Sequence, residues 1–227
     1  MCGRFCQVLL RREIRELLDL TETTVPDSDQ RRYNGAPGQD FVVCRLGPGG
    51  ERIATMLRWG LVPFWSRQRS IGTRLINARS ETLAIKPSFR AAYRQRRCLV
   101  PVNGWFEWQR TDSGRQPYYI VQDSGSPTVL AGLWERWSGG DAVLETFTVI
   151  TRDATADLAA IHHRQPVVIG SEDFAAWLHP GSQRGVVDRI LVARPPRFQF
   201  RPISNLVNNP RNDQPEILDV RRINQAE

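Results

Sequence analysis

The chain has 227 residues, of which 41% are hydrophobic and 24% are charged, an ordinary globular composition with enough apolar material for a core. Its formal net charge is +7 and its isoelectric point is near 9.9, a balance that indicates a polyanionic partner. No apolar run approaches the ~20 residues of a membrane span, and the N-terminus lacks the pattern of a signal peptide. We therefore expect a cytoplasmic protein (or a nuclear one, in a eukaryote) with no membrane partner.

The first part of the chain predicts one helix followed by a hairpin. Residues 9–20 carry leucines and an isoleucine at helical spacing, which predicts an amphipathic helix. Further along, the strand-like runs FVVCRL (41–46) and RIATMLRWG (52–60) flank the turn GPGGE. Two such runs around a glycine-rich turn are typical of a β-hairpin.

The rest of the chain predicts mainly antiparallel strands, separated by the turn signals DSG, DSGS and SGGD. The strand-like runs are RRCLVPV (96–102), WFEWQR (105–110), PYYIVQ (117–122), TVLAGLWERW (128–137), LETFTVIT (144–151) and FQFRPI (198–203).

Short helices are expected at 153–163, capped by Asp153, and at 171–178, with Ser171 as N-cap; residues 204–218 are expected to form a loop. We therefore predict an α+β protein: a β-rich single domain over 1–227, with a curled antiparallel sheet or partial barrel flanked by short helices.

Several common catalytic motifs are missing from the sequence. GPGG is followed by Glu-Arg and not by Lys-Ser/Thr, so it is no phosphate loop, and neither GxSxG nor HExxH occurs. His162 and His163 have no second cluster at zinc spacing, so we predict no metal and no cofactor. The cysteines show no CxxC pair and are expected to be thiols, with Cys44 and Cys98 acting as small core residues.

The N-terminus MCGRF places Cys2 directly after the initiator methionine. Cysteine is small enough for the methionine to be trimmed, which would leave an α-amine and a thiol on adjacent carbons. No internal cysteine offers this 1,2-aminothiol. The alternative is a chance residue at a disordered terminus.

Glu107 is a carboxylate among aromatic residues in the run GWFEWQ. Strand alternation places Trp105, Glu107 and Gln109 on one face and Phe106 and Trp108 on the other. A carboxylate buried among indoles lowers the stability of the fold unless it is paired with a cation, and a protein keeps such a group where its raised pKa serves catalysis. The alternative is a salt bridge at the rim with one of the many arginines.

A spacing of two residues recurs in Cys2-x-Arg4, Asn77-x-Arg79 and His162-x-Arg164. Residues two apart in extended backbone point the same way, so converging segments would place three arginines around one reactive pocket. Guanidinium groups bind phosphates in a bidentate way, which suits a nucleic acid on both sides of the pocket. With so many arginines the repeat could be coincidence. A structural role for His162, a turn position for Asn77 and a GC-rich genome behind the arginine content stay open as alternatives.

Motifs along nearly the whole chain resemble the SOS-response-associated peptidase family, also called abasic-site processing proteins. The blocks that carry the resemblance are MCGRF (1–5), RYNGAP (32–37), WGLVPFW (59–65), INARSET (76–82), RRCLVPVNGWFEW (96–108), AGLWE (131–135), HHRQP (162–166) and VNN (207–209). The chain departs from the family pattern at Gln165, Phe106 and Gly35, which stand beside the reactive positions and are expected to alter pocket shape or rate only.

The resemblance implies binding of single-stranded DNA that contains an abasic site, followed by a covalent thiazolidine cross-link through Cys2. It implies that Cys2 is the nucleophile, that Asn77, Glu107 and His162 are the other active-site residues, and that Arg4, Arg79 and Arg164 bind the DNA backbone. We expect Trp65, Trp105 and Trp108 to be candidates for stacking on flanking bases, with core packing as the alternative for each.

Two other functions compete with this interpretation. An N-terminal-cysteine peptidase or amidohydrolase would use the same residues for acyl transfer. A non-catalytic single-strand binding module would bind DNA without any need for Cys2. Under the main interpretation we expect a monomer that shields abasic sites during the DNA damage response and associates with the nucleoid when bound to DNA, with abasic-site lyase and peptidase activities as possible additions.

Overall fold

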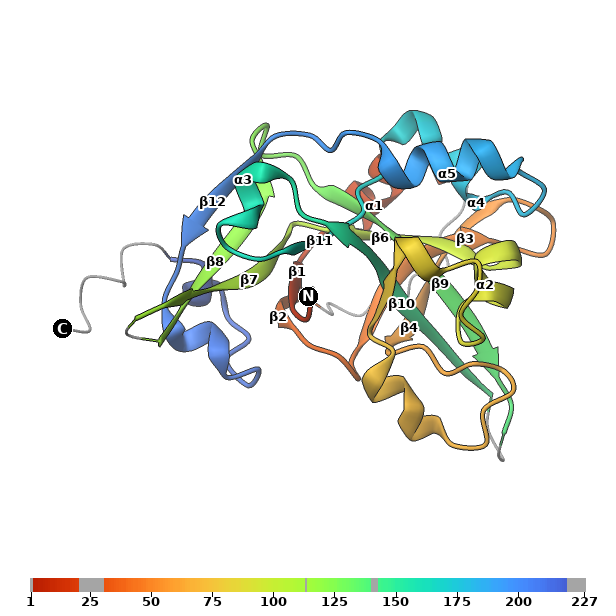
Figure 1. Cartoon of the computed structure of the whole chain (residues 1–227), viewed down its shortest axis with the longest axis horizontal. Coiled ribbons are helices and arrows are strands. Elements are labelled where there is room, and N and C mark those ends of the chain that lie inside the picture. The colour runs from red at the N-terminus through yellow and green to blue at the C-terminus, as the bar shows by residue number, and fades with distance from the viewer. Residues whose placement is uncertain (1, 21–30, 113, 140–142, 220–227) are drawn as a thin grey trace.

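The computed structural model describes residues 2–20, 31–112, 114–139 and 143–219, and it is built mainly from two β-sheets (Figure 1). The described helices are short and lie around these sheets. The predicted β-rich α+β class is therefore confirmed.

The larger sheet curls into a barrel. Its strands are hydrogen-bonded in the order β11-β10-β4-β3-β6-β9, and an additional pairing of β10 with β9 closes the ring from β10 to β9. Strand β5 lies outside the ring and pairs in parallel with β10. The strands are β3 (Asp40–Leu46), β4 (Arg52–Trp59), β5 (Asn77–Arg79), β6 (Arg97–Val102), β9 (Thr128–Trp137), β10 (Leu144–Asp153) and β11 (Arg164–Pro166). The predicted hairpin at 41–60 is β3 and β4, and the predicted curled sheet or partial barrel is confirmed.

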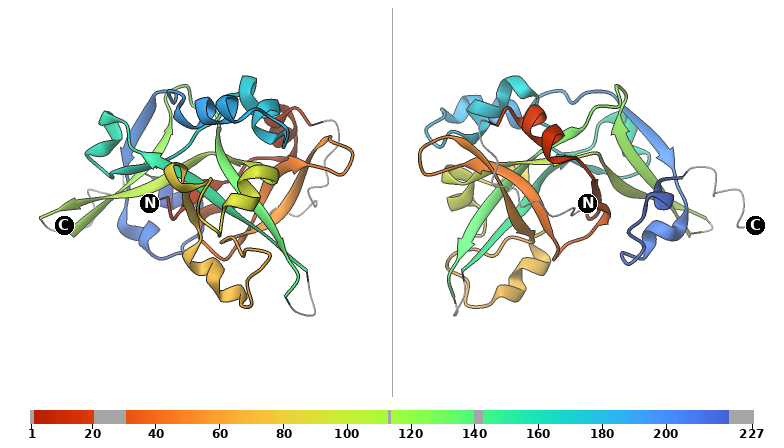
Figure 2. Two further views of the ribbon diagram at one scale, coloured as in Figure 1. Left: turned by 45° about the vertical axis from the view of Figure 1, so that its right-hand side comes forward. Right: turned by 180° about the vertical axis from the view of Figure 1, so that it is seen from behind.

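The second sheet has the order β12-β8-β7-β1-β2, with every neighbouring pair antiparallel. Its strands are β1 (Phe5–Gln7), β2 (Arg32–Gly35), β7 (Gly104–Thr111), β8 (Gly114–Gln122) and β12 (Phe198–Pro202). Strand β1 lies between β2 and β7, so the first residues of the chain run through the middle of the molecule (Figures 1 and 2).

The helices cover the outside of the sheets. They are α1 (Arg11–Leu18), α2 (Arg90–Gln95), α3 (Ala156–Ala159), α4 (Phe174–Leu178) and α5 (Arg184–Val192), with 3-10 turns η1 (Arg69–Arg74), η2 (Ser80–Thr82), η3 (Ser171–Asp173), η4 (Asn205–Asn208) and η5 (Pro215–Leu218). Figures 1 and 2 show α1, α4 and α5 grouped over one end of the barrel. None of the helices formed by the described residues is long and apolar enough to cross a membrane.

Both predicted helix caps are wrong. Helix α3 begins after Thr155, because Asp153 still belongs to β10 and its carboxylate pairs with Arg164. Ser171 makes no capping hydrogen bond; it opens η3, which follows Gly170. The segment 204–218, expected as a loop, contains η4 and η5.

Three apolar clusters hold these layers together. One fills the helix-covered part of the barrel, and a second lies where the barrel meets the second sheet. This second cluster contains Cys2, Phe5, Trp59, Trp105 and Phe147, with Phe5 stacked on Trp59 at 4.5 Å between ring centroids. A third cluster, around Cys6, packs the other face of β7 and β8 against the C-terminal segment. Cys2 thus sits in the apolar layer between the two sheets.

Candidate active site

Cys2 is fully buried, and its backbone is fixed from two sides. The Asn77 side-chain amide donates a hydrogen bond of 2.8 Å to the Cys2 carbonyl oxygen. On the other side, the Phe106 N–H donates to the Arg4 carbonyl at 3.0 Å, and Phe5 pairs with Trp105 across β1 and β7. The alternative of a disordered terminus is wrong for Cys2, because this residue is built into the junction of the two sheets.

Asn77 reaches Cys2 from strand β5. This strand runs parallel to β10, with Asn77 opposite Val149 and Arg79 opposite Thr151. Extended backbone leaves Ala78 buried on one face and the side chains of Asn77 and Arg79 on the other. The predicted shared face of Asn77 and Arg79 is therefore confirmed.

Glu107 lies on the face of β7 that looks toward Cys2. Trp105 belongs to the Cys2 cluster and Phe106 to the Cys6 cluster, so the predicted strand alternation is confirmed. Glu107 is only 2% exposed, so it does not lie at the rim of the sheet. Burial raises the pKa of the Glu107 carboxyl to about 7. A group that titrates near neutrality can both give and take a proton at physiological pH.

The environment of Cys2 keeps its thiol protonated. Burial raises the thiol pKa well above its usual value, and the negative charge of Glu107 raises it further. The thiolate is the nucleophilic form of cysteine, so at neutral pH this thiol is a weak nucleophile unless a nearby base takes its proton. Glu107 is close enough to influence that proton.

His162 lies in the turn between α3 and β11. Its neighbours Leu158 and Ile161 pack in the same cluster as Cys2, and Gln109 on β7 donates to the carbonyl of Ala160 at 3.0 Å. These contacts bring the turn to the end of the sheet junction that holds Cys2. His162 and His163 precede β11, which begins at Arg164, so a shared direction of the His162 and Arg164 side chains stays a prediction.

The ring of His162 is held by the backbone of Arg164. The Arg164 N–H donates to Nδ1 at 3.0 Å, and burial lowers the pKa of His162. In the neutral imidazole, an Nδ1 that accepts this hydrogen bond leaves the proton on Nε2. Nδ1 also lies 3.1 Å from the Arg164 carbonyl oxygen, so the Arg164 backbone fixes the ring and leaves Nε2 at its other end.

The three predicted DNA-binding arginines have different surroundings. Arg4 is half-buried and donates to Asn34 Oδ1 at 2.6 Å and to the Val207 carbonyl at 2.9 Å, with its guanidinium 6.0 Å from the centre of the Trp108 ring. Both hydrogen-bond partners are neutral, so its charge is oriented but is not neutralised by them. Arg79 is exposed.

Arg164 differs from these two because its side chain is buried between carboxylates. It pairs with Glu81 at 2.7 Å and with Asp153 at 2.5 Å, and it donates to the Thr151 carbonyl at 2.8 Å. Its binding to the DNA backbone stays a prediction, but this geometry favours a role in holding β11, and with it His162, against β10.

The tryptophans also separate into different roles. Trp65 is 49% exposed, so a face of its ring is open to a base. Trp108 is partly buried and donates from Nε1 to Asn208 at 2.7 Å. Trp105 is 1% exposed, so for this residue the core-packing alternative holds. Stacking by Trp65 and Trp108 stays a prediction.

The three departures from the family pattern have structural explanations. A Cβ atom on Gly35 would lie 2.5 Å from the Phe41 ring and 2.9 Å from the Phe5 carbonyl, so this strand position has room for glycine only. The Gln165 side chain accepts from the Thr155 N–H at 2.8 Å and so fixes the start of α3. Phe106 is buried against Tyr119.

Three supporting residues were not foreseen from the sequence. Asn34 anchors Arg4, whereas Glu81 and Asp153 hold Arg164. Asn34 and Glu81 stand inside the RYNGAP and INARSET blocks, which was the signal that could have found them.

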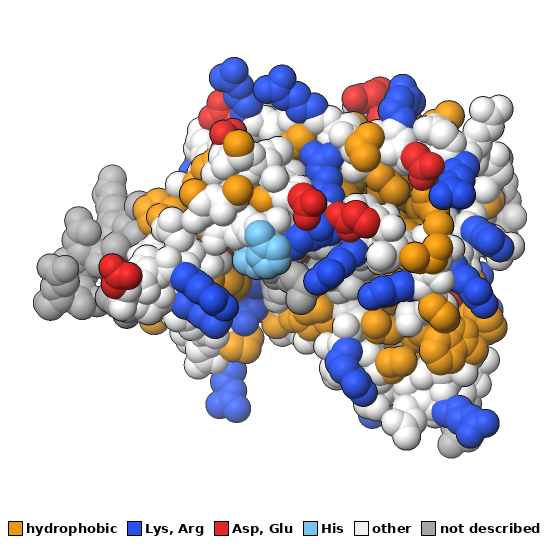
Figure 3. All heavy atoms as spheres, viewed as in Figure 1, with side chains coloured by type: hydrophobic (Ala, Val, Ile, Leu, Met, Phe, Trp, Pro, Cys, Tyr) orange, Lys and Arg blue, Asp and Glu red, His pale blue; other side chains and the backbone are white. Residues whose placement is uncertain are grey.

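Lys and Arg side chains are spread over this face of the molecule, and Asp and Glu side chains lie among them (Figure 3). Among the described residues, no three His, Cys, Asp or Glu side chains are grouped so that they could hold a metal ion.

Comparison with known proteins finds a family and a fold that this chain shares. The model of the SOS response associated peptidase (SRAP) family matches residues 1–210. The abasic site processing protein YoaM of Bacillus subtilis is 33% identical over 224 residues, which cover 97% of this chain and 98% of that protein. The abasic site processing protein HMCES of Gallus gallus is 32% identical over 194 residues and matches 74% of this chain and 57% of its own length. A crystal structure of a Bacteroides thetaiotaomicron protein superimposes with a TM-score of 0.84 at 25% identity, covering 96% of this chain and 99% of that one.

Proposed function

The chain belongs to the SOS response associated peptidase family, and from this membership we propose that it processes abasic sites by forming a covalent cross-link between Cys2 and single-stranded DNA. The observation that carries the proposal is the placement of Cys2. Its backbone is fixed by Asn77, and its thiol lies close to a carboxyl group, Glu107, that titrates near pH 7.

The first step is attack by an amine. Removal of Met1 leaves Cys2 with a free α-amine, whose reference pKa is about 7.7–8, so part of it is neutral near pH 7. This amine adds to the aldehyde of the open-chain abasic sugar, and loss of water gives an imine. The protonated Glu107 carboxyl can give a proton to the departing hydroxyl.

The second step closes a ring. The Cys2 thiol adds to the carbon of the protonated imine, so a C–S bond forms, the C=N electron pair moves to the nitrogen, which keeps its proton, and a five-membered thiazolidine results. Because amine and thiol are on adjacent carbons, the reaction is intramolecular and strongly favoured. Glu107, now ionised, can take the thiol proton as the C–S bond forms, so the reaction does not require a free thiolate, which the raised thiol pKa disfavours.

The remaining residues bind and orient the DNA. Nε2 of His162 can hydrogen-bond to the sugar hydroxyl that is released when the abasic ring opens, and Asn77 holds the Cys2 backbone. Arg4 and Arg79 would contact phosphates on the two sides of the abasic sugar. Trp65 would stack on a flanking base. One chain can carry out these steps on one strand, so we expect a monomer acting on chromosomal DNA, and therefore a cytoplasmic protein associated with the nucleoid when bound.

Peptidase action fits these surroundings less well. A cysteine peptidase needs a thiolate, but burial and Glu107 raise the pKa of the Cys2 thiol. The imine route starts from the amine and needs the thiol only afterwards.

The test is a denaturing gel with a single-stranded oligonucleotide that contains one abasic site. Wild-type protein should give a shifted band that survives boiling. Cys2→Ser protein with Met1 removed should give a band only after borohydride trapping, because a hydroxyl closes a much less stable ring. Cys6→Ala should cross-link normally, because Cys6 has no α-amine and lies in a different cluster.

Protein that retains Met1, confirmed by mass spectrometry, should not form the boiling-resistant band. If it cross-links as fast as trimmed protein, the aminothiol mechanism is wrong. A peptide hydrolysed by the mature protein, but not by Cys2→Ala, would support the peptidase instead. Salt-sensitive binding with no dependence on Cys2 would support a simple single-strand binding module.

A further inference from the structure

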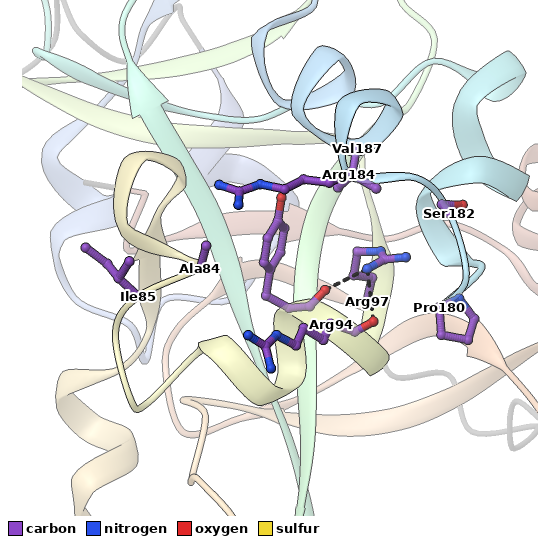
Figure 4. A pocket seen from close by; sticks show the side chains of 9 residues that line it. Ala84, Ile85, Arg94, Arg97, Pro180, Ser182, Arg184 and Val187 are labelled. Carbon is purple, nitrogen blue, oxygen red and sulfur yellow. Dashed lines mark hydrogen bonds between the residues drawn. The ribbon is translucent and has the colours of Figure 1, made fainter.

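A second pocket lies between α2, α5 and the segment that follows η2, and it contains none of the candidate active-site residues. Its volume is about 410 Å³, and it is lined by Ala84, Ile85, Tyr93, Arg94, Arg97, Pro180, Ser182, Arg184 and Val187 (Figure 4). The proposed reaction makes no use of this pocket.

Part of the pocket is aliphatic. Ala84 and Ile85 form one side, Pro180 lies on the other, and Val187 closes it from α5 (Figure 4). Ile85 is 70% exposed, an unusual position for a large apolar side chain with no partner over it. A concave apolar surface of this kind fits one apolar side chain of a ligand.

The rest of the pocket is cationic. Its lining includes three arginines and no carboxylate. The guanidinium groups of Arg94 and Arg184 lie on opposite sides and extend in the same direction, toward Ala84 and Ile85 (Figure 4). Arg94 makes no side-chain ion pair with any part of the chain that the structure describes, and Arg184 has only a 3.4 Å contact with Asp188, a pair whose side chains are 78% and 52% exposed.

The third arginine adds charge beneath the pocket. Arg97 is buried, and its guanidinium donates to backbone carbonyls, among them those of Tyr93 and Trp177. These partners are neutral, so the positive charge of Arg97 is not cancelled by them.

We propose that this pocket docks an acidic peptide segment of a partner protein, with one apolar side chain of the peptide between Ile85 and Val187 and its carboxylates on Arg94 and Arg184. The charges are complementary, and guanidinium binds carboxylate in a bidentate way. Nucleic acid fits less well. Single-strand binding needs open aromatic faces, but Tyr93 is 8% exposed and its hydroxyl donates to Asp188 at 3.1 Å.

The test is fluorescence anisotropy of the full chain with a short fluorescein-labelled peptide in which aspartates flank a Leu-Phe pair. Wild-type protein should bind it saturably, and added salt should weaken binding. Arg94→Glu and Arg184→Glu should each weaken affinity at least about fivefold, since each replaces an attraction by a repulsion. Ile85→Ser should also weaken it. Peptides with asparagine for aspartate, or Ser-Ser for Leu-Phe, should bind more weakly.

Matched control variants distinguish binding in the pocket from nonspecific attraction to the positive charge or to exposed apolar side chains elsewhere on the surface. Arg12→Glu reverses an exposed arginine on α1, and Val192→Ser removes a 75% exposed valine on α5; neither residue lines the pocket, and both variants should bind as wild type. Abasic-site cross-linking by Arg94→Glu should equal that of wild type, so this test and that of the proposed function can fail separately.

Three results would overturn the proposal. The first is affinity unchanged in both Arg94→Glu and Arg184→Glu. The second is binding lost in Arg79→Ala, which would mean that the peptide imitates DNA at the proposed active site. The third is an intact oligonucleotide that displaces the peptide and itself loses affinity in Arg94→Glu, which would make the pocket a nucleic-acid surface.

Discussion

The carboxyl group of Glu107 is buried, and burial disfavours its charged form. Burial raises its pKa from 4.5 to about 7. In the unfolded chain the pKa returns to its ordinary value, so between these two values the folded protein binds more protons than the unfolded chain. The free energy of unfolding therefore falls as pH rises through this interval, and above pH 7 the full cost of about 3 kcal/mol is present.

Replacing this carboxyl should stabilise the protein at high pH. We expect Glu107→Gln to raise the free energy of unfolding at pH 8 by up to about 3 kcal/mol, with little change at pH 4.5. Urea unfolding followed by tryptophan fluorescence at both pH values measures the difference. Glu51→Gln, at an exposed carboxylate in the turn between β3 and β4, is the control and should change neither value. Equal stabilisation at both pH values would contradict the argument.

The same substitution should slow the proposed reaction. Glutamine keeps the shape of Glu107 but cannot transfer a proton, so single-turnover cross-linking should fall by roughly 10²–10⁴-fold. Binding to intact single strands should stay nearly unchanged, because Glu107 is buried beneath the surface. Gel-based cross-linking rates and anisotropy titrations measure the two effects. An unchanged single-turnover rate would remove Glu107 from the mechanism.

At the residue scale, sequence patterns predicted which face of a strand a side chain occupies better than they predicted its hydrogen-bond and ion-pair partners. Alternation along β7 placed Glu107 correctly, because a strand fixes which side chains share a face. Arg164 was interpreted as a phosphate ligand because nothing local shows that Glu81 lies against it. That ion pair joins residues 83 positions apart, and only the pairing of β5 and β11 with β10 brings them together.

Strand β10 is the element that assembles the site. It pairs with β5 on one side and with β11 on the other, so it positions both the Asn77 strand and the turn that contains His162. Arg79 leaves β5 toward solvent, whereas Arg164 is enclosed between β11, Asp153 and Glu81. Two arginines on neighbouring elements thus have different surroundings.

Alanine substitutions should separate these two arginines. Arg79→Ala should weaken single-strand binding on any base sequence and lower the salt slope of log K by about 0.7, the single-strand value for one phosphate contact. Arg164→Ala should instead lower the free energy of unfolding by about 1–3 kcal/mol, because the buried Thr151 carbonyl loses its donor and the ion pairs with Glu81 and Asp153 are lost. Anisotropy across a salt series and urea unfolding measure both variants. A lowered slope with unchanged stability in Arg164→Ala would mean that Arg164 contacts phosphate after all.

Arg97 joins two short helices at their ends. Its guanidinium donates to the Tyr93 carbonyl at 2.6 Å in the last turn of α2, and to the carbonyls of Trp177 and His179 at the end of α4. The last carbonyls of a helix have no partner within it, and a cation there also offsets the negative end of the helix dipole. One side chain therefore completes both helices.

Removing these donors should loosen that corner of the barrel. We expect Arg97→Met, which keeps the length of the side chain, to lower the free energy of unfolding by at least about 2 kcal/mol, because several carbonyls lose their partners. Arg94→Met, at the exposed neighbouring arginine, is the control and should have little effect. Urea unfolding measures both. If Arg97→Met and wild-type protein have equal free energies of unfolding, water replaces Arg97 as the hydrogen-bond donor to these carbonyls.

At the element scale, long periodic segments were predictable and short ones were not. The hairpin at 41–60 and the strands between 96 and 151 follow from their apolar runs and turns. Helices α2 and α5 were not predicted, because α2 is short and the apolar run within α5 also fits a strand. The cap at Asp153 failed because a tertiary ion pair with Arg164 competes with local capping.

On the scale of the whole molecule, the two ends of the described chain are joined through Asn34. Its side-chain amide donates to the carbonyls of Val207, Asn209 and Asn212, at 3.1, 3.1 and 2.8 Å. Its side-chain oxygen Oδ1 accepts a hydrogen bond from the Arg4 guanidinium at 2.6 Å. Asn34, which is fully buried on β2, therefore connects the C-terminal segment to Arg4, two residues after Cys2.

Loss of this connection should affect stability and DNA binding together. We expect Asn34→Ala to lower the free energy of unfolding by roughly 1–3 kcal/mol, because buried carbonyls lose their donor. It should also speed tryptic cleavage after Arg211, since that residue lies in the segment that Asn34 holds. Single-strand affinity should fall as well, because Arg4 loses its Asn34 contact and the fixed position of Val207. Asn205→Ala, at an exposed asparagine in the same segment, is the control for all three measurements. Cleavage after Arg211 at the wild-type rate would mean that the C-terminal segment is held mainly by Ile203, Val207 and Ile217 in the Cys6 cluster. Unchanged single-strand affinity would mean that Arg4 needs no support from Asn34.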